Sequence, residues 1–476
     1  MTDDAEQPLK ADYLVVGAGA MGFAFTDEIL TGSPDATVLM IDSAERSGGH
    51  WIHAYPFVRL HQPSAYYGVS SRELGSDRID TSGRNIGLRE LADKQEILAY
   101  FDAVLDERFR ASGRVRFLPR HQYLGDGSIR DLVSGRTRHV EAGKIVDASY
   151  MHVKVPAIEP PRFRVAEGVS CVPPNTLAEP GFIEGYEVFT VIGAGKTAFD
   201  AILYLFDLGV APNRIHWVKP RESWLLDRAN VQPEGTIPGV SVVDWVAAQA
   251  SIATAATSLD DFMLQSEKVG AVLRIDPDIQ PTMFRCATVS QIEVVELRAI
   301  RQVIRKGRVT AIDPGVLHCD EADVPMPTAT VYINCTSDGL EKRPLQPVFN
   351  GRSIVLQAVR ACQQVFSAAM IGFVETSGET DAVKNDICRP VQHPDETIDY
   401  LTLVKNLMEN TDRYAARPEV LHWLAHSRLE TFITPATLEL LNGSAGAEPT
   451  RLREQLFAAT QRIEAFLRSV DEKEMA

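Results

Sequence analysis

One short stretch near the start of the chain limits its possible folds more than any other feature. Residues 13–16 form an apolar run that fits a buried strand, and residues 17–22 read Gly-Ala-Gly-Ala-Met-Gly, a GxGxxG pattern. A helical pattern follows over residues 20–30, and a second apolar run over residues 37–41 ends at Asp42. A strand, a glycine turn, a helix and a second strand in this order predict a βαβ unit in a parallel sheet.

Each glycine of this turn has a separate task. Gly17 lets the chain leave the strand sharply, Gly19 has no side chain to keep a pyrophosphate away, and Gly22 lets the helix pack closely on the sheet. The helix aims its free N–H groups and the positive end of its dipole at the phosphates. Asp42, 25 residues after Gly17, can accept hydrogen bonds from both ribose hydroxyls of an unphosphorylated adenosine. The stretch is therefore predicted to bind a dinucleotide; a glycine-rich turn without a ligand is the alternative.

A second glycine pattern occurs 176 residues after the first. Residues 186–192 form a β-rich run, residues 193–198 read Gly-Ala-Gly-Lys-Thr-Ala, a GxGxxA pattern, and a helical pattern covers residues 197–208. The flanks are again those of a βαβ unit, so a second dinucleotide site is expected. Its predicted binding residues are Gly193, Gly195, Lys196, Thr197 and Ala198.

The two motifs differ in the residues that would meet the ribose. The strand after the second helix, residues 215–218, ends in Lys219-Pro220-Arg221 and not in an acid. Lys219 and Arg221 are placed to pair with a 2′-phosphate, which favours NADPH over NADH. The alternative is that both are solvated loop charges. Two motifs, acidic and then basic at this position, predict that a pyridine nucleotide delivers hydride to a flavin.

The segment after Asp42 has an unusual composition that suits the rim of an aromatic cofactor. Two glycines permit close approach to a ligand, and flat aromatic side chains alternate with polar ones. The residues concerned are Gly48, Gly49, Trp51, Tyr55, Arg59, His61 and Gln62.

An acid followed by Gly-Gly-x-Trp and Tyr-Pro-x-x-Arg resembles the FAD- and NADPH-dependent monooxygenases, which include flavin-containing monooxygenases, N-hydroxylases and Baeyer–Villiger enzymes. The resemblance covers mainly residues 12–68 and 186–221. It implies that the first motif and Asp42 hold the adenosine end of FAD. It also implies flavin-end contacts from Gly49, Trp51, Arg59, His61 and Gln62, of which Arg59, His61 and Gln62 are the candidate catalytic residues.

Two departures from the family pattern bear on the chemistry. His61 stands near the position where Baeyer–Villiger enzymes have an acid, so a catalytic role and a hydrogen-bonded place in the pocket wall are both open. The phenylalanine-glycine-histidine fingerprint common between the two glycine motifs is absent, and residues 156–168 occupy its approximate place.

The resemblance implies an α/β fold with two Rossmann-like dinucleotide-binding domains, the second inserted in the first. The expected FAD-binding domain is residues 1–185 with 340–394. The expected NADPH-binding domain is residues 186–339, with a helical insertion near residues 222–285 that carries substrate contacts. Residues 395–476 read as a helical C-terminal region.

The implied activity is a monooxygenase reaction on a small organic substrate, in which NADPH reduces FAD and dioxygen forms a flavin hydroperoxide. Such a site excludes water and positions its ligands more than it uses acid–base residues. Two alternatives are an FAD-dependent oxidoreductase that inserts no oxygen and a catalytically silent flavoprotein. Neither the substrate nor the oligomeric state can be deduced from the sequence.

Composition excludes several other classes of function. The formal net charge of −16 argues against nucleic acid or an anionic membrane as a main partner. Residues 1–10 show no secretory signal, and residues 354–374 contain too many polar groups for a membrane span, so a cytoplasmic location is expected. The six cysteines are widely spaced, which predicts reduced thiols with neither a zinc cluster nor a disulfide-reductase pair.

Overall fold

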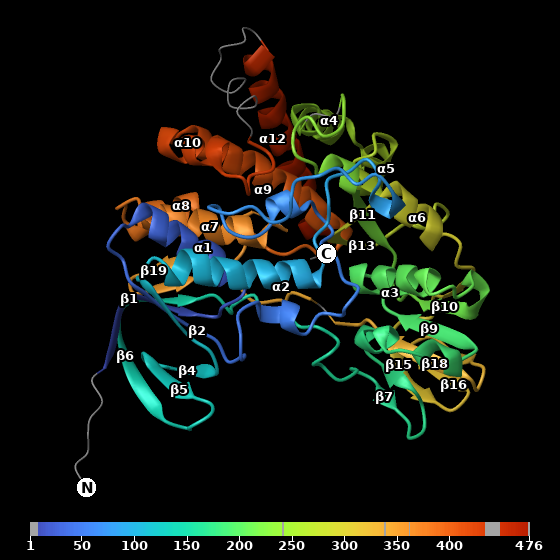
Figure 1. Ribbon diagram of the computed structural model, residues 1–476. Helices are drawn as coiled ribbons and strands as arrows, with labels where there is room; N and C mark the ends of the chain where they lie inside the picture. Colours follow the sequence, from blue (N-terminus) through green and yellow to red (C-terminus); the bar gives the residue numbers. More distant parts are fainter. Residues whose placement is uncertain (1–7, 240–241, 338, 361, 434–447, 475–476) are drawn as a thin grey trace.

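The computed structural model describes residues 8–239, 242–337, 339–360, 362–433 and 448–474. Two parallel sheets form its frame, and each contains one of the two glycine turns. Figure 1 shows the sheets as two lobes, with the blue and cyan strands of the first on one side and the green and yellow strands of the second on the other. The chain therefore has the predicted α/β fold with two Rossmann-like units.

The first sheet has the strand order β19-β20-β6-β1-β2-β3. Strand β1 lies inside it, parallel to β2 and to β6, with Tyr13 opposite both Val38 and Lys144. Strand β20 pairs in parallel with β6, so the chain returns to this sheet late in the sequence. The strands are β1 (Leu9–Val16), β2 (Val38–Ile41), β3 (Val115–Leu118), β6 (Thr137–Asp147), β19 (Phe349–Asn350) and β20 (Ser353–Val355), with the hairpin β4 (His121–Gly125) and β5 (Ser128–Asp131) attached to β6.

Helices α1 (Ala20–Gly32) and α7 (Gln364–Glu375) pack against each other in this lobe. Both helices are almost entirely buried, and their contact is close because a Cβ added to Gly372 would lie 2.9 Å from the Phe25 carbonyl oxygen. Helix α2 (Lys94–Ala103) begins with a capping box at Asp93 and continues as a π-helical segment, Val104–Arg110. Together the two segments form one continuous helical stretch from Lys94 to Arg110.

The second sheet has the order β14-β10-β9-β18-β8, and every pair in it is parallel. Helix α3 (Lys196–Asp207) follows the second glycine turn, and α6 (Gln291–Leu297) packs beside it. The strands are β8 (Cys171–Val172), β9 (Val188–Ile192), β10 (Ile215–Val218), β14 (Gln302–Ile304) and β18 (Thr330–Asn334).

Residues 164–172 pair with strands of the second lobe, although the expected boundary lies at residue 186. Strand β8 joins the second sheet beside β18, and β7 (Arg164–Val165) extends a neighbouring sheet formed by β15 (Val309–Asp313), β16 (Val316–Cys319) and β17 (Asp323–Pro325). The segment that connects the two lobes therefore already pairs with the second lobe before residue 186.

The insertion and the C-terminal helices share one hydrophobic core. A three-stranded sheet, β12-β11-β13, carries Trp224 and Phe284 into this core, where they meet Tyr400 and Ile463 from the end of the chain. Figure 1 shows the red helix α12 beside the green α4, and the two helices are in contact. The elements of this core are β11 (Ser223–Asp227), β12 (Val272–Leu273), β13 (Met283–Val289), α4 (Val242–Ala255), α5 (Leu259–Lys268), α9 (Thr397–Ala415) and α12 (Glu448–Glu474). Two other helices, α8 (Asp381–Ile387) and α10 (Pro418–His426), pack instead in the core of the first lobe.

Among the described residues, no helix is both long and apolar enough to cross a bilayer.

Candidate functional site

The first glycine turn has the tight geometry that the motif requires. Gly17 has a φ of +112°, in the region that favours glycine, and its N–H donates to the Ile41 carbonyl at 2.8 Å. A Cβ added to Gly22 would lie only 2.2 Å from the Gly17 carbonyl oxygen, so α1 can begin this close to the sheet only with glycine there. The turn therefore fits a dinucleotide cradle at the carboxyl end of β1.

Asp42 orders the same turn. Its two carboxylate oxygens accept hydrogen bonds from the backbone N–H groups of Ala18 at 2.7 Å and Ala44 at 2.8 Å. A carboxylate offers about four acceptor positions, so these bonds leave roughly two for a ribose diol. The predicted role of Asp42 remains compatible with its contacts.

The loop after Asp42 closes against the first turn. Gly48 donates to the Ala18 carbonyl at 3.0 Å, and a Cβ added to Gly49 would lie 3.0 Å from the Cα of Gly19. Trp51 is buried, and its indole N–H donates to the Tyr67 hydroxyl at 2.6 Å. Because Gly19 and Gly49 have no side chains, the loop can approach the turn this closely. The two backbones together can then enclose a ligand.

The three candidate catalytic residues have different surroundings. Arg59 is exposed, and its guanidinium donates to the Leu91 carbonyl at 3.2 Å. Gln62 is partly buried. The Nδ1 atom of His61 accepts from the Thr288 N–H at 3.3 Å, which places the proton of a neutral imidazole on Nε2. Burial of the ring, followed by the charges of Lys196 and Arg228, lowers the pKa of His61 to about 3, so the side chain is uncharged at neutral pH.

The second glycine turn is open where the first is enclosed. Gly193 has a φ of +138°, and a Cβ there would lie 2.8 Å from the Cys335 carbonyl oxygen, so glycine is required. Gly195 is exposed, and a Cβ added to it would meet nothing within 4 Å. The free space in front of Gly195 and the first N–H groups of α3 fit a pyrophosphate.

A buried polar cluster joins this second turn to the loop of the first lobe. Lys196, the first residue of α3, pairs with Asp200 one turn later, and the side chains are 19% and 11% exposed. The buried Tyr55 donates its hydroxyl to the other Asp200 oxygen at 2.7 Å. One turn further along α3, Phe57 stacks on Tyr204 with ring centroids 3.9 Å apart. Through Asp200 and Tyr204, helix α3 therefore contacts the loop that carries Arg59 and His61.

The two cations predicted to bind a 2′-phosphate are already engaged. Lys219 is 2% exposed, donates to Glu222 at 2.5 Å and lies over the Trp217 ring. Arg221 pairs with Glu396 from the C-terminal region at 2.5 Å and bonds the Thr282 carbonyl. Lys219 is thus a buried, neutralised charge and not a free loop cation. Of the two, only Arg221 keeps a partly exposed side chain that a phosphate can reach.

Two of the six cysteines form a disulfide, which corrects the prediction that all are reduced. Cys286 and Cys362 are bonded, with Cα atoms 6.2 Å apart, while Cys171, Cys319, Cys335 and Cys388 are free. The pair is invisible in the sequence because 76 positions separate its members and only the fold brings β13 to the loop before α7.

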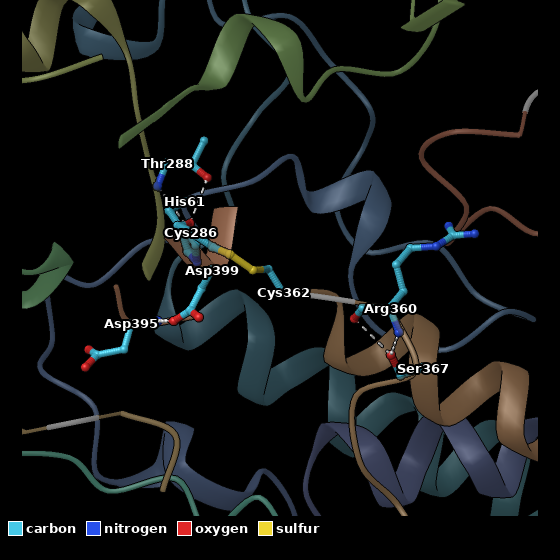
Figure 2. Close-up of a disulfide and its surroundings, with 8 residues drawn as sticks. All are labelled: His61, Cys286, Thr288, Arg360, Cys362, Ser367, Asp395 and Asp399. Carbon is cyan, nitrogen blue, oxygen red and sulfur yellow. Dashed lines mark hydrogen bonds between the residues drawn. A yellow bond between two sulfur atoms is a disulfide. The ribbon is translucent and has the colours of Figure 1, made fainter. Parts of the chain in front are cut away.

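Figure 2 shows the disulfide between the His61 side of the site and the start of α7. Cys286 lies in a bulge of β13, between the Trp224↔Phe284 and Leu226↔Thr288 pairs, and has a φ of +57°. Two residues later, the backbone of Thr288 donates to His61. A bulge re-aims a side chain out of a strand, and here it directs Cys286 toward the first lobe.

Comparison with known proteins decides the family of the chain. No family model matches it. It is 47% identical over 428 residues to the uncharacterized protein Rv2000 of Mycobacterium tuberculosis, and equally so to the uncharacterized protein Mb2023 of Mycobacterium bovis. Each match covers 90% of this chain and 79% of the relative. The chain belongs to this mycobacterial protein family.

The fold of this chain is similar to that of a solved monooxygenase. The polycyclic ketone monooxygenase of the thermophilic fungus Thermothelomyces thermophila matches with a TM-score of 0.50, over 96% of this chain and 86% of that protein. The sequences are only 12% identical, so the likeness concerns the fold. It confirms the predicted resemblance at the level of two dinucleotide-binding units in one chain.

Several residues of the site escape prediction from sequence. Asp200 is one, although its spacing of four from Lys196 on a helical pattern was a usable signal. Thr288 and the fully buried Arg228, which donates to the His61 carbonyl at 3.0 Å and pairs with Glu293 at 2.7 Å, had no such signal. Their roles arise from contacts between segments more than 160 residues apart.

Proposed function

We propose that this member of the mycobacterial family is an FAD-dependent oxidoreductase that takes hydride from NADPH and oxygenates a small organic substrate. The main support is the Tyr55–Asp200 hydrogen bond, because it joins the loop beside the first cradle to the helix that begins the second. Two nucleotides held at these turns would meet where the lobes touch. Such an arrangement suits transfer between two cofactors.

The first cradle is assigned to FAD. Gly17, Gly19 and Gly22 would admit the pyrophosphate, Asp42 would hold the ribose, and the loop at Gly49 would enclose the path toward the isoalloxazine ring. When bound, FAD supplies two-electron chemistry and reactivity with dioxygen that no side chain provides. The closed contact between Gly19 and Gly49 suits a ligand that stays in place.

The second cradle is assigned to the pyridine nucleotide. Gly193, Gly195 and the start of α3 from Lys196 to Ala198 would bind its pyrophosphate. Arg221 is proposed to contact the 2′-phosphate in exchange for its surface pair with Glu396. The charge of Lys219 is already balanced by Glu222, so this buried lysine would stabilise the segment that carries Arg221.

The remaining groups shape the space between the cradles. His61 is held as a neutral donor by Thr288, and Arg228 fixes its backbone, so the Nε2–H group can orient a substrate or cofactor oxygen without adding charge. The insertion with β11 and β13, backed by the C-terminal helices, is proposed to provide the substrate wall. The substrate class itself stays outside the proposal.

The alternatives of an oxidoreductase without oxygen insertion and of a silent flavoprotein are separated by experiment. The purified protein should be yellow, and anaerobic NADPH should bleach its flavin absorbance. A colourless protein that refuses added FAD would refute the assignment of the first cradle. Absence of bleaching would leave the silent flavoprotein, and product free of label under isotopic dioxygen would leave the plain oxidoreductase.

A further inference from the structure

The pairing of Lys196 with Asp200 is unexpected at this point of the fold. Lys196 is the first residue of α3, where the helix dipole disfavours a cation, so its place does not serve helix stability. The same end of the helix, with the open backbone of Gly195 beside it, favours an anion. A phosphate at the turn would therefore lie within the reach of the flexible Lys196 side chain.

Asp200 depends on this cation. Its carboxylate is about one-tenth exposed and receives two groups on the described chain, the Lys196 ammonium and the Tyr55 hydroxyl. Desolvation raises the pKa of Asp200, while Lys196 and Tyr55 oppose that rise. A buried carboxylate that loses a neighbouring cation becomes easier to protonate, because the remaining hydrogen bond from a neutral hydroxyl does not balance its charge.

We propose that Lys196 exchanges Asp200 for the pyrophosphate of a bound pyridine dinucleotide, and that Asp200 then takes up one proton from solvent. The inference rests on the proposed nucleotide binding at the second turn. The step balances as follows: the ammonium of Lys196 moves from the carboxylate to the phosphate, and one proton taken from solvent neutralises the carboxylate of Asp200. Binding at one cradle thereby changes the protonation of a group that touches the other lobe.

The other titratable groups described around Asp200 do not replace the positive charge of Lys196. Glu293 on α6 adds negative charge that raises the pKa of Asp200, although its own partner is Arg228. His61 is neutral and feels the Lys196 charge, and Cys335 on β18 interacts with Asp200 as a buried neutral thiol whose pKa is raised by burial. Among the described residues around this carboxylate, Lys196 is thus the cation in direct contact with it.

Tyr55 would carry the change to the first lobe. Its hydroxyl donates to an ionised carboxylate, and that charge-assisted bond weakens when Asp200 is protonated. Tyr55 belongs to the loop that continues to Arg59 and His61. Tyr55 and Asp200 are therefore positioning residues: nucleotide binding at the second turn changes their hydrogen bond, and this changes how the flavin-end loop is held.

The direct test is calorimetric titration of the full-length, flavin-loaded protein with NADP⁺ in buffers of different ionisation enthalpy, between about pH 5 and pH 8. The proposal predicts uptake of up to about one proton per chain, with a maximum at the pH where Asp200 is ionised in the free protein and protonated in the complex. Binding with no proton uptake across this range would overturn the inference. Absence of binding to NADP⁺ and NAD⁺ alike would instead refute the proposed second cradle.

Three variants separate this exchange from a merely structural role. In Asp200→Asn, Lys196 no longer has to leave a carboxylate, so proton uptake should vanish while NADP⁺ binds equally well or several-fold more tightly. In Lys196→Met, Asp200 is already uncompensated in the free protein, so uptake should also vanish while affinity falls about tenfold. In Tyr55→Phe, uptake should persist with its maximum at higher pH, because the carboxylate has lost a donor.

The outcomes of these variants are distinct. A structural role for Asp200 predicts weaker binding and lower thermal stability in Asp200→Asn, opposite to the exchange. Uptake that persists unchanged in Asp200→Asn would assign the proton to another group and overturn the proposal. Circular dichroism and retained flavin absorbance confirm that each variant is folded before its proton balance is read.

Discussion

The two glycine turns have the same local geometry but differ in what surrounds them. At the first, the loop through Gly49 approaches Gly19 and the carboxylate of Asp42 is tied to the turn. At the second, Gly195 faces open space and the nearest charged group, Lys196, is held by Asp200. An enclosed turn suits a ligand that stays bound, whereas an open turn suits a ligand that exchanges. This difference matches a resident flavin and a pyridine nucleotide that must leave after each turnover.

The largest expected effect comes from adding one methyl group to each cradle. Gly19 has a φ of −90° and Gly195 a φ of −105°, which any residue adopts, and neither added Cβ would clash with the chain. Each methyl would occupy the space of a pyrophosphate, at a cost of about 3–4 kcal/mol in binding free energy. Gly19→Ala should lose FAD, whereas Gly195→Ala should keep FAD and lose NADPH binding more than about 100-fold.

These effects can be measured by flavin absorbance and by titration with NADPH. Gly185→Ala is the matched control, because its Cβ also meets nothing within 4 Å and lies away from both turns. If Gly195→Ala bound NADPH as tightly as the unchanged protein, the second cradle would have been wrongly assigned.

The disulfide gives the next largest effect, because it ties strand β13 of the insertion to the loop before α7. Cross-linking residues 76 positions apart stabilises the folded chain by about 3 kcal/mol, mainly by restricting the unfolded state. Cys286→Ser and Cys362→Ser should lower the unfolding free energy by that amount in urea, and a reductant should then have no further effect. Cys171→Ser is the control, since Cys171 is free. Alkylation that finds six free thiols in the untreated protein would contradict the disulfide.

The choice between NADPH and NADH sharpens the assignment of the second cradle. Arg221→Ala should weaken NADPH by about 2 kcal/mol and NADH by much less, because one charge-assisted phosphate contact is lost. Lys219→Met should affect mainly stability, since it leaves Glu222 with Arg305 as its remaining cation. Dissociation constants for both coenzymes provide the measurement. An equal loss of both in Arg221→Ala would mean that this side chain does not contact the 2′-phosphate.

The change with the smallest effect at neutral pH concerns acid stability at the junction of the lobes. Burial holds the pKa of His61 at about 3, against an ordinary value of 6.5. Between these values the unfolded chain binds a proton that the folded chain does not, so stability falls as pH decreases through this window, by about 1 kcal/mol per pH unit. His61→Asn keeps an acceptor for Thr288 and should flatten the pH dependence of urea unfolding. The same change at the exposed His53 should have no effect.

The sequence predicts well whatever depends on neighbours along the chain. Strand β1, the turn at Gly17 and helix α1 follow from a local pattern of apolar residues and glycines, and so do β9, Gly193 and α3. The predicted two-lobed α/β fold is confirmed. It could be predicted because two such units in one chain are compatible with few other architectures. The surroundings of Lys219 could not be predicted from the same local segment, because neither its burial nor its pair with Glu222 follows from residue type, and its role at the coenzyme stays a prediction.

Side-chain partners distant in sequence account for most of what was missed. The Cys286–Cys362 bond, the Arg221–Glu396 pair and the Thr288–His61 contact each join segments that no periodicity relates. Charge and residue type alone cannot show whether a cation is free, paired or buried. The roles of Arg59, His61 and Gln62 at the flavin end therefore stay predictions.

The shared core of the insertion and the C-terminal helices has a consequence for biosynthesis. Trp224 and Phe284 reach the ribosome exit long before Tyr400 and Ile463, which cover them in the finished protein. The nascent insertion must wait, with its apolar side chains uncovered, until the last stretch of the chain has been made. A premature stop near the end of the message would consequently damage the substrate wall, although it would remove none of the residues that form either nucleotide turn.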